Sequence, residues 1–192
     1  MSKAILISIK PKYVADILNG KKTIEIRKTM PKCDLPIDVY IYCTKDNHQL
    51  VKPKDYDKHL LFTKGAVNYL QEQSLNGKVV AKFTLNKVEM IVYKYLIYST
   101  RTLDETYLLN KSNLSYNELD DYLRGFGYAW HIDNLIIFDK PKELSGFVIA
   151  RPTKPLYSLT DINKKEPIRF KSIKPLTKSP QSWCYVEVLE NE

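Results

Sequence analysis

The chain has 192 residues, 44% of them apolar and 27% charged, which is typical of one globular domain or one domain with a sizeable insertion. This composition excludes collagen-like, fibrous and wholly disordered proteins. A chain of this length can bury a large core without a disulfide or a structural metal. Lys and Arg number 30 against 22 Asp and Glu, which gives a formal net charge of +8. Such a basic excess is compatible with a polyanionic partner, although a surface selected only for solubility has the same composition.

The distribution of apolar residues, cysteines and histidines limits the class of protein further. No apolar run approaches the roughly 18 residues of a transmembrane helix, so no membrane partner is expected. The first ten residues alternate and lack the apolar core of a signal peptide, so we expect a cytoplasmic protein. No metal site, disulfide framework or cofactor is predicted, because no C-x-x-C pair or histidine cluster occurs among Cys33, Cys43, Cys184, His48, His59 and His131.

The first quarter of the chain predicts a strand, a helix and two more strands. Residues 4–10 alternate apolar and polar side chains and predict a half-buried strand. Helical spacing over Pro11–Asn19, with proline first and Gly20 after the end, predicts a short helix. Alternation returns over Lys22–Thr29, and Val39–Thr44 is rich in Tyr and β-branched residues, so both segments predict strands.

The middle of the chain is less regular. Residues 46–76 are polar and weakly periodic, and we interpret them as an insertion or long loop with one helix at Lys64–Gln73. The dipeptide Asn76-Gly77 predicts a turn. Residues 78–91 predict one long strand, or two strands joined by a bulge, and residues 93–98 can continue it.

The last third begins with a helix signal and ends with a strand. Ser115 and Glu118 form a capping box, which predicts a helix that Gly125 ends. Residues 128–138 are strand-like with a turn at Asp133-Asn134. The basic, proline-rich residues 140–180 are expected to be extended and dominated by loops. Residues 183–189 predict a closing strand.

Many short strands and few helices predict an α+β domain built around a curved sheet or small barrel. The opening strand–helix–strand does not continue as alternating βα units, so a Rossmann-type sheet is not expected. The sequence contains neither G-x-G-x-x-G nor G-x-x-x-x-G-K-[ST], which excludes the usual dinucleotide and P-loop sites.

The densest group of charged side chains is Lys22, Glu25 and Arg27. Glu25 and Arg27 project from the strand face opposite Ile24 and Ile26. A carboxylate between two cations stays ionised and can accept hydrogen bonds from a base amino group, while the cations can hold a phosphate or carbonyl oxygen. The alternative is a row of ion pairs on an exposed sheet surface, which contributes little.

These residues lie in G-x-K-x-x-E-x-R, residues 20–27, which resembles the signature of the ASCH domain family, a branch of the PUA-like superfamily. Three further regions resemble bacterial and prophage members: 39–44, 128–135 with 141–144, and 180–185. The resemblance covers residues 5 to about 187. It implies a small PUA-like β-barrel with flanking helices, here a single domain over 1–192 with the insertion at about 46–76 and the basic segment at about 140–180. It also implies a cleft beside the motif strand that binds RNA or a nucleotide-like ligand.

The resemblance leaves an enzymatic alternative open. Some small family members are amidohydrolases that deacylate N4-acetylcytidine with a Lys, a Thr nucleophile three residues later and a distant Glu. Lys22 matches the Lys, but Glu25 stands where the Thr is expected, and Thr23 lies elsewhere. A carboxylate does not replace a hydroxyl nucleophile without changing the chemistry. Another member is a metal-assisted ribonuclease. If this chain is a hydrolase, Lys22 is the predicted base and Glu25 the acid, base or metal ligand.

Aromatic side chains supply possible stacking surfaces for bases. The chain has 14 Tyr, 6 Phe and 2 Trp, and bases stack on such rings, although core packing is the commoner role. Both Trp residues lie in the family-like segments, and Gln181 and Ser182 can hydrogen-bond a base edge. The predicted ligand-binding residues are Lys22, Glu25, Arg27, Tyr42, Trp130, Gln181, Ser182 and Trp183.

Three functions follow as hypotheses. The first is a non-catalytic protein that binds RNA or a nucleotide-like ligand. The second is a hydrolase acting on a modified nucleoside or on RNA. The third is a protein-interaction module whose basic surface contacts an acidic protein partner. They differ in whether nucleic acid binds, and in whether it is turned over.

Overall fold

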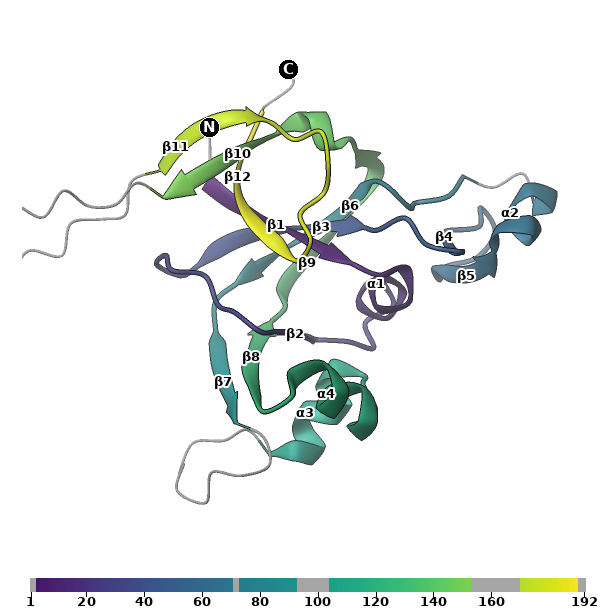
Figure 1. Cartoon of the computed structure of the whole chain (residues 1–192). Helices are drawn as coiled ribbons and strands as arrows, with labels where there is room; N and C mark the ends of the chain where they lie inside the picture. Colours follow the sequence, from purple (N-terminus) through teal and green to yellow (C-terminus); the bar gives the residue numbers. More distant parts are fainter. Residues whose placement is uncertain (1–2, 71–72, 93–103, 153–169, 190–192) are drawn as a thin grey trace, which may run out of the picture.

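The structure, a computed structural model, describes residues 3–70, 73–92, 104–152 and 170–189, whose strands form three sheets (Figure 1). The largest sheet has the order β11-β10-β12-β1-β3-β6-β9. Its strands are β1 (Lys3–Ile9), β3 (Ile37–Cys43), β6 (Val79–Leu85), β9 (Asp133–Lys142), β10 (Phe147–Pro152), β11 (Phe170–Pro175) and β12 (Trp183–Val188).

A second sheet and a hairpin complete the strands. The second sheet has the order β2-β8-β7, and the hairpin pairs β4 with β5. These strands are β2 (Ile24–Arg27), β4 (His48–Val51), β5 (Leu60–Thr63), β7 (Val88–Val92) and β8 (Phe126–His131). The helices are α1 (Pro11–Leu18), α2 (Lys64–Leu70), α3 (Glu105–Ser112) and α4 (Tyr116–Leu123), with a 3-10 turn at Leu144–Gly146. The α+β prediction is confirmed.

The first strand lies at the centre of the large sheet. β1 pairs in parallel with β3 and antiparallel with β12. Ile5, Ile7 and Ile9 pack into one core cluster, while Ala4 and Leu6 pack into another on the opposite side. The prediction of a half-buried strand is therefore wrong, because a central strand of this sheet is covered on both faces.

The predicted helix after β1 is confirmed as α1. Pro11 occupies its first turn, and Gly20, with a φ of 73°, follows its end. A left-handed backbone of this kind suits glycine because other residues carry a Cβ that crowds the carbonyl. The chain then turns directly into β2 (Figure 1).

The chain passes between the two main sheets twice. Residues 78–91 form two strands in different sheets, since β6 pairs with β3 and β7 pairs with β8. The expectation of one continuous or bulged strand is therefore wrong, and residues 93–98 lie outside the described ranges. The chain returns after β8, and the predicted turn at Asp133-Asn134 is the start of β9, where Asn134 has a φ of 49°.

The segment 46–76 contains more regular structure than predicted. Its helix is confirmed as α2, within Lys64–Gln73, and the β4–β5 hairpin was not predicted because its strands are short and lack clear alternation. The hairpin is attached to the end of α1. The side-chain amide of Asn19 donates to the carbonyl of His59 at 2.9 Å, and its oxygen accepts from the His59 N–H at 2.9 Å.

The basic segment 140–180 is also more ordered than expected. β10 and β11 form an antiparallel pair within it, whereas residues 153–169 lie outside the described ranges. The predicted closing strand is confirmed as β12, but it lies inside the sheet between β10 and β1. The predicted closed barrel is not confirmed, because the large sheet is open, with β11 and β9 as its edges. Pro141 in β9 has no N–H to donate to a further strand.

The second sheet has one face covered by helices. The capping box that begins α4 is confirmed, with the side chain of Ser115 accepting from the Glu118 N–H. Ile24, Ile26, Leu119 and Leu123 are part of one buried cluster between β2 and the helices. The charged side chains of β2 therefore lie on the other face. None of the helices in the described ranges has the length and apolar character that crossing a membrane requires.

Candidate ligand-binding cleft

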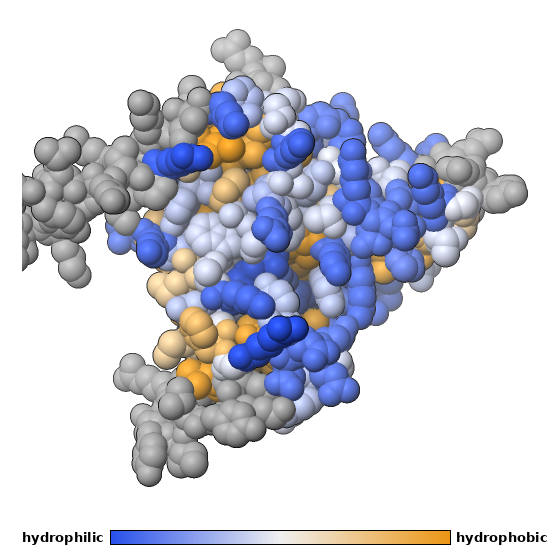
Figure 2. Space-filling view, viewed as in Figure 1, coloured by the Kyte–Doolittle hydropathy of each residue, from blue (hydrophilic) through white to orange (hydrophobic). Residues whose placement is uncertain are grey.

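A cleft of about 390 Å³ lies beside β2, between the ends of β1 and α1 on one side and α4 on the other. Figure 1 shows α1 and α4 flanking β2, and Figure 2 shows hydrophilic side chains gathered over β2 and α4. The residues that line the cleft are Ser8, Ile9, Lys10, Tyr13, Lys22, Glu25, Ile26, Arg27, Thr44, Leu114, Glu118, Tyr122, Gln181 and Ser182.

The charged group predicted from the motif forms the inner wall of this cleft. The Glu25 carboxylate lies between two cations, with Oε2 3.3 Å from Lys22 Nζ and Oε1 3.1 Å from Arg27 Nη2. Exposed fractions are 2% for Lys22, 4% for Glu25 and 8% for Arg27. The alternative of an exposed row of surface ion pairs is therefore wrong. A buried group of this kind needs compensating partners, because removing charges from water is costly.

Backbone carbonyls hold the two cations in place. Lys22 Nζ donates to the carbonyl of Ser112 at the end of α3, at 2.8 Å. Arg27 Nη2 donates to the carbonyl of Ser8 at the end of β1, also at 2.8 Å. The Ser8 N–H in turn donates to the carbonyl of Ser182 at 2.8 Å. The motif strand is thereby tied to α3, β1 and the start of β12.

Two atoms of the inner wall have no hydrogen-bond partner. Glu25 Oε2 and Arg27 Nε are buried and make no hydrogen bond in the structure. The contact of Glu25 Oε2 with Lys22 Nζ is an ion pair that lacks hydrogen-bond geometry. Buried polar atoms nearly always have partners, and an unmade bond costs about 1–3 kcal/mol. Both atoms belong to residues that line the cleft, and both are closed to solvent in the structure.

A second carboxylate on the cleft, Glu118, is already committed to protein partners. It accepts from Lys12 Nζ at 2.7 Å and from the Tyr13 hydroxyl at 3.4 Å. Hydrogen bonds from Lys12 and from the Ser115 backbone and hydroxyl lower the pKa of Glu118 to about 2. The pKa of Tyr13 is raised, mainly by burial and then by the nearby Glu118 charge. Glu118 is therefore a permanent anion of the cleft above strongly acidic pH.

Sequence reasoning missed several of these cleft residues. Glu118 was recognised only as part of a capping box, and neither Tyr13 nor Tyr122 was singled out. Only the approach of α4 to α1, where Glu118 contacts Lys12 and Tyr13, brings these side chains to one cleft. No local signal in the sequence distinguishes a helix side chain that packs in the core from one that lines a cleft.

The structure brings five of the predicted ligand-binding residues together. Lys22, Glu25, Arg27, Gln181 and Ser182 all line the cleft. The last two reach it because the segment before β12 lies against the end of β1, where the Ser8 hydroxyl donates to the carbonyl of Pro180 at 2.7 Å.

Three predicted residues do not line the cleft. Tyr42 is buried in the core cluster on the other side of the large sheet. Trp130 is fully buried in the main core, directly opposite Glu25 in the β2–β8 ladder. Trp183 is half-buried, stacks edge-on against Trp130 at 5.5 Å, and donates from Nε1 to the Thr29 hydroxyl at 2.9 Å. Trp130 and Trp183 both pack in the main core.

Metal ligands are not grouped in the described ranges. No set of three or more His, Cys, Asp or Glu side chains there could hold a metal ion. Cys43 is buried, and burial raises the pKa of its thiol to about 12. At neutral pH it therefore carries no thiolate with which to attack a substrate.

Comparison with known proteins relates the chain to one family. The most similar solved structures include an ASCH protein from Zymomonas mobilis, with 18% identity, a TM-score of 0.46 and coverage of 73% of each chain. A mutant of that protein has 17% identity and a TM-score of 0.45, over 73% of this chain and 76% of the other. None of the curated proteins compared with the chain matches it. The ASCH domain family matches residues 7–189, and the chain therefore belongs to the ASCH domain family.

Proposed function

We propose that the chain binds RNA or a nucleotide-like ligand by taking a nucleobase into the cleft beside β2. The observation that carries this proposal is that the buried charged residues Lys22, Glu25 and Arg27 line this cleft, and that Glu25 Oε2 and Arg27 Nε make no hydrogen bond within the protein. A site of about 390 Å³ is within the usual range for small ligands, roughly 300–1,000 Å³.

The two atoms favour a ligand edge that carries a donor next to an acceptor. The Glu25 carboxylate, held between two cations, is ionised and only accepts hydrogen bonds. Arg27 Nε only donates. The edges of nucleobases place N–H groups beside carbonyl oxygens or ring nitrogens, and side chains read them through such pairs. A bare phosphate supplies acceptors for Arg27 but no donor for Glu25.

The charge and the family support the same class of ligand. The net charge of +8 favours association with a polyanion, and this attraction weakens as salt is added. Membership of the ASCH family supports a nucleic-acid-binding role for a PUA-like domain.

The test is a titration of the purified chain with short single-stranded RNA, matching DNA and free nucleotides over a range of salt. We expect RNA binding that Glu25→Gln and Arg27→Lys each weaken by about tenfold, since each loses a charge-assisted hydrogen bond. Asp139→Asn is the matched control, because it removes one negative charge from an exposed position outside the cleft. Binding that is equally strong in the two cleft variants would contradict the proposal.

A second candidate is hydrolysis of a modified nucleoside or of RNA, and the position of Lys22 favours it. Its ammonium group lies on the cleft 3.3 Å from Glu25, where the pair can exchange a proton with a bound substrate. Incubating acylated nucleosides and RNA with the chain, with and without divalent metals, tests this activity. Turnover that Lys22→Ala abolishes while the fold survives would establish it. Absence of any nucleic-acid affinity would instead favour a protein partner.

A further inference from the structure

We propose that the cleft holds a single nucleotide unit in one orientation, with its base against α4 and its phosphate against the end of β1. This inference rests on the proposed function and assigns new roles to Lys10, Thr44, Leu114 and Tyr122, which line the cleft. It follows from three features: the neutralised inner wall, an apolar and aromatic rim, and a cationic rim.

The inner wall is not suited to a phosphate group. Lys22 and Arg27 already face the carboxylate of Glu25, at 3.3 and 3.1 Å, so their charges are largely compensated. A phosphate placed there also approaches that buried carboxylate, and like charges at close range repel strongly away from water. The unpartnered acceptor and donor of Glu25 and Arg27 instead match the polar edge of a base.

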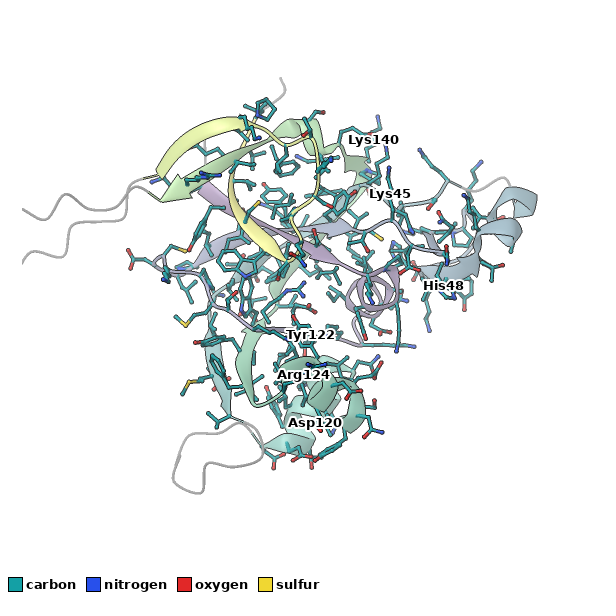
Figure 3. All side chains as sticks on the ribbon, in the orientation of Figure 1. Lys45, His48, Asp120, Tyr122, Arg124 and Lys140 are labelled. Carbon is teal, nitrogen blue, oxygen red and sulfur yellow. The ribbon has the colours of Figure 1, made fainter. Side chains whose placement is uncertain are left out.

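The rim formed by Leu114 and Tyr122, here called the α4 rim, suits the flat face of the base. Tyr122 lies on the side of α4 that faces β2 (Figure 3), and the ammonium of Lys28 lies 5.3 Å from its ring centre. Aromatic rings at such positions stack on bases and contribute about 1–3 kcal/mol each. Glu118 is also on this rim, and its carboxylate is paired with Lys12 at 2.7 Å.

The opposite rim, here called the β1 rim, suits the phosphate. Its described lining residues are Ser8, Ile9, Lys10, Thr44, Gln181 and Ser182, and none of them carries a carboxylate. Lys10 supplies a cation, and Thr44 and Ser182 supply hydroxyl donors.

Arg27 connects the two halves of the cleft. Its Nη2 group contacts both the Glu25 carboxylate at 3.1 Å and the Ser8 carbonyl at 2.8 Å, so its guanidinium spans from the inner wall to the β1 rim. Its Nε makes no hydrogen bond within the protein, and the residue as a whole is 8% exposed. The cleft volume of about 390 Å³ is near the lower end for ligand sites, which suits one nucleotide unit rather than several.

The experiment compares each of the four ribonucleosides with its 5′-monophosphate by calorimetry, using the wild-type chain and single variants. We expect the monophosphate to bind more tightly than the nucleoside. Lys10→Gln should lower affinity for the monophosphate by about threefold to tenfold and leave nucleoside affinity unchanged. Glu25→Gln and Tyr122→Leu should weaken both ligands by the same factor, so the ratio of the two affinities is preserved.

The control is Lys45→Gln, which removes one exposed lysine next to Thr44 that does not line the cleft. It should leave both affinities unchanged. A Lys10→Gln variant that weakens nucleoside and monophosphate equally would overturn the orientation, as would a Glu25→Gln variant that weakens only the monophosphate. If the wild-type chain binds RNA but neither nucleosides nor monophosphates, the single-nucleotide site is wrong while the proposed function stands; if it binds none of these ligands, both fail.

Discussion

Glu25 of β2 lies directly opposite Trp130 of β8 in the antiparallel ladder, and each carries a buried polar atom without a hydrogen-bond partner. Residues opposite one another in such a ladder project from the same face of the sheet. The indole of Trp130, fully buried, therefore lies on the same face as the charged wall of the cleft. This arrangement places a rigid aromatic ring on the same sheet face as a carboxylate that pairs with Lys22 and Arg27.

The first prediction concerns the balance of charge between Glu25 and the two cations. Glu25→Ala should lower the free energy of unfolding by about 3–5 kcal/mol, because it leaves the buried cations Lys22 and Arg27 without their common anion. Urea unfolding followed by circular dichroism measures the loss. The double variant Lys22→Met/Glu25→Met should recover part of it, because a buried pair is removed together. A loss below about 1 kcal/mol in Glu25→Ala would show that water already solvates the wall.

The second prediction concerns acid stability. The pKa of Glu118 is about 2 in the folded chain against an ordinary value of 4.5, so the unfolded chain binds more protons between these values. The stabilisation by Glu118 is therefore fully present above pH 4.5 and is lost as the pH falls toward 2. Glu118→Gln should show a shallower decrease in unfolding free energy over this window, measured by urea unfolding at a series of pH values. If the unfolding free energy falls equally steeply with pH in the wild-type chain and in Glu118→Gln, Lys12 and Ser115 do not stabilise the ionised carboxylate of Glu118.

The third prediction concerns the close approach of α4 to β2 at Gly127. A Cβ at this position would lie 2.4 Å from Leu123 Cδ2 and 2.9 Å from the carbonyl oxygen of Arg27. Gly127→Ala should therefore cost about 1–3 kcal/mol of stability, and it should weaken ligand binding by displacing Arg27. Thermal unfolding and the nucleotide titration measure the two effects. Gly65→Ala is the matched control, since its Cβ meets nothing within 4 Å and it lies within α2, where alanine is favoured.

The fourth prediction separates packing from ligand binding at Trp183. Because Trp183 does not line the cleft, Trp183→Phe should leave nucleotide affinity within about twofold. The variant should lose about 1 kcal/mol of stability with the hydrogen bond to the Thr29 hydroxyl. Calorimetric titration and urea unfolding of the same preparation measure both quantities. A large loss of affinity with unchanged stability would instead support the contact with ligand that the sequence predicted.

Local regularities of the sequence predicted much of the local structure. The alternation over residues 22–29 placed Glu25 and Arg27 on one face of a strand, and the capping box at Ser115 marked the start of α4. Gly20 marked the end of α1 in the same way. These signals work because a strand has a period of two residues, and because caps and turns involve neighbours within about four residues.

Other elements escaped prediction for a physical reason. The β4–β5 hairpin and the pair of β10 and β11 are short, and their pairing depends on tertiary contacts that local spacing does not show. The sequence also did not predict that residues 78–91 divide between two sheets, since both halves have the same local preference for strand.

The sequence by itself determined the class of fold, the family-like motif and the identity of the charged residues on β2. Only the tertiary structure decided that these charges are buried and that a cleft forms over them. Lys22 is held by a carbonyl 90 residues away, and Ser8 by one 172 residues away. Such contacts depend on which segments meet in space, and no spacing along the chain encodes the burial and the pairing that result.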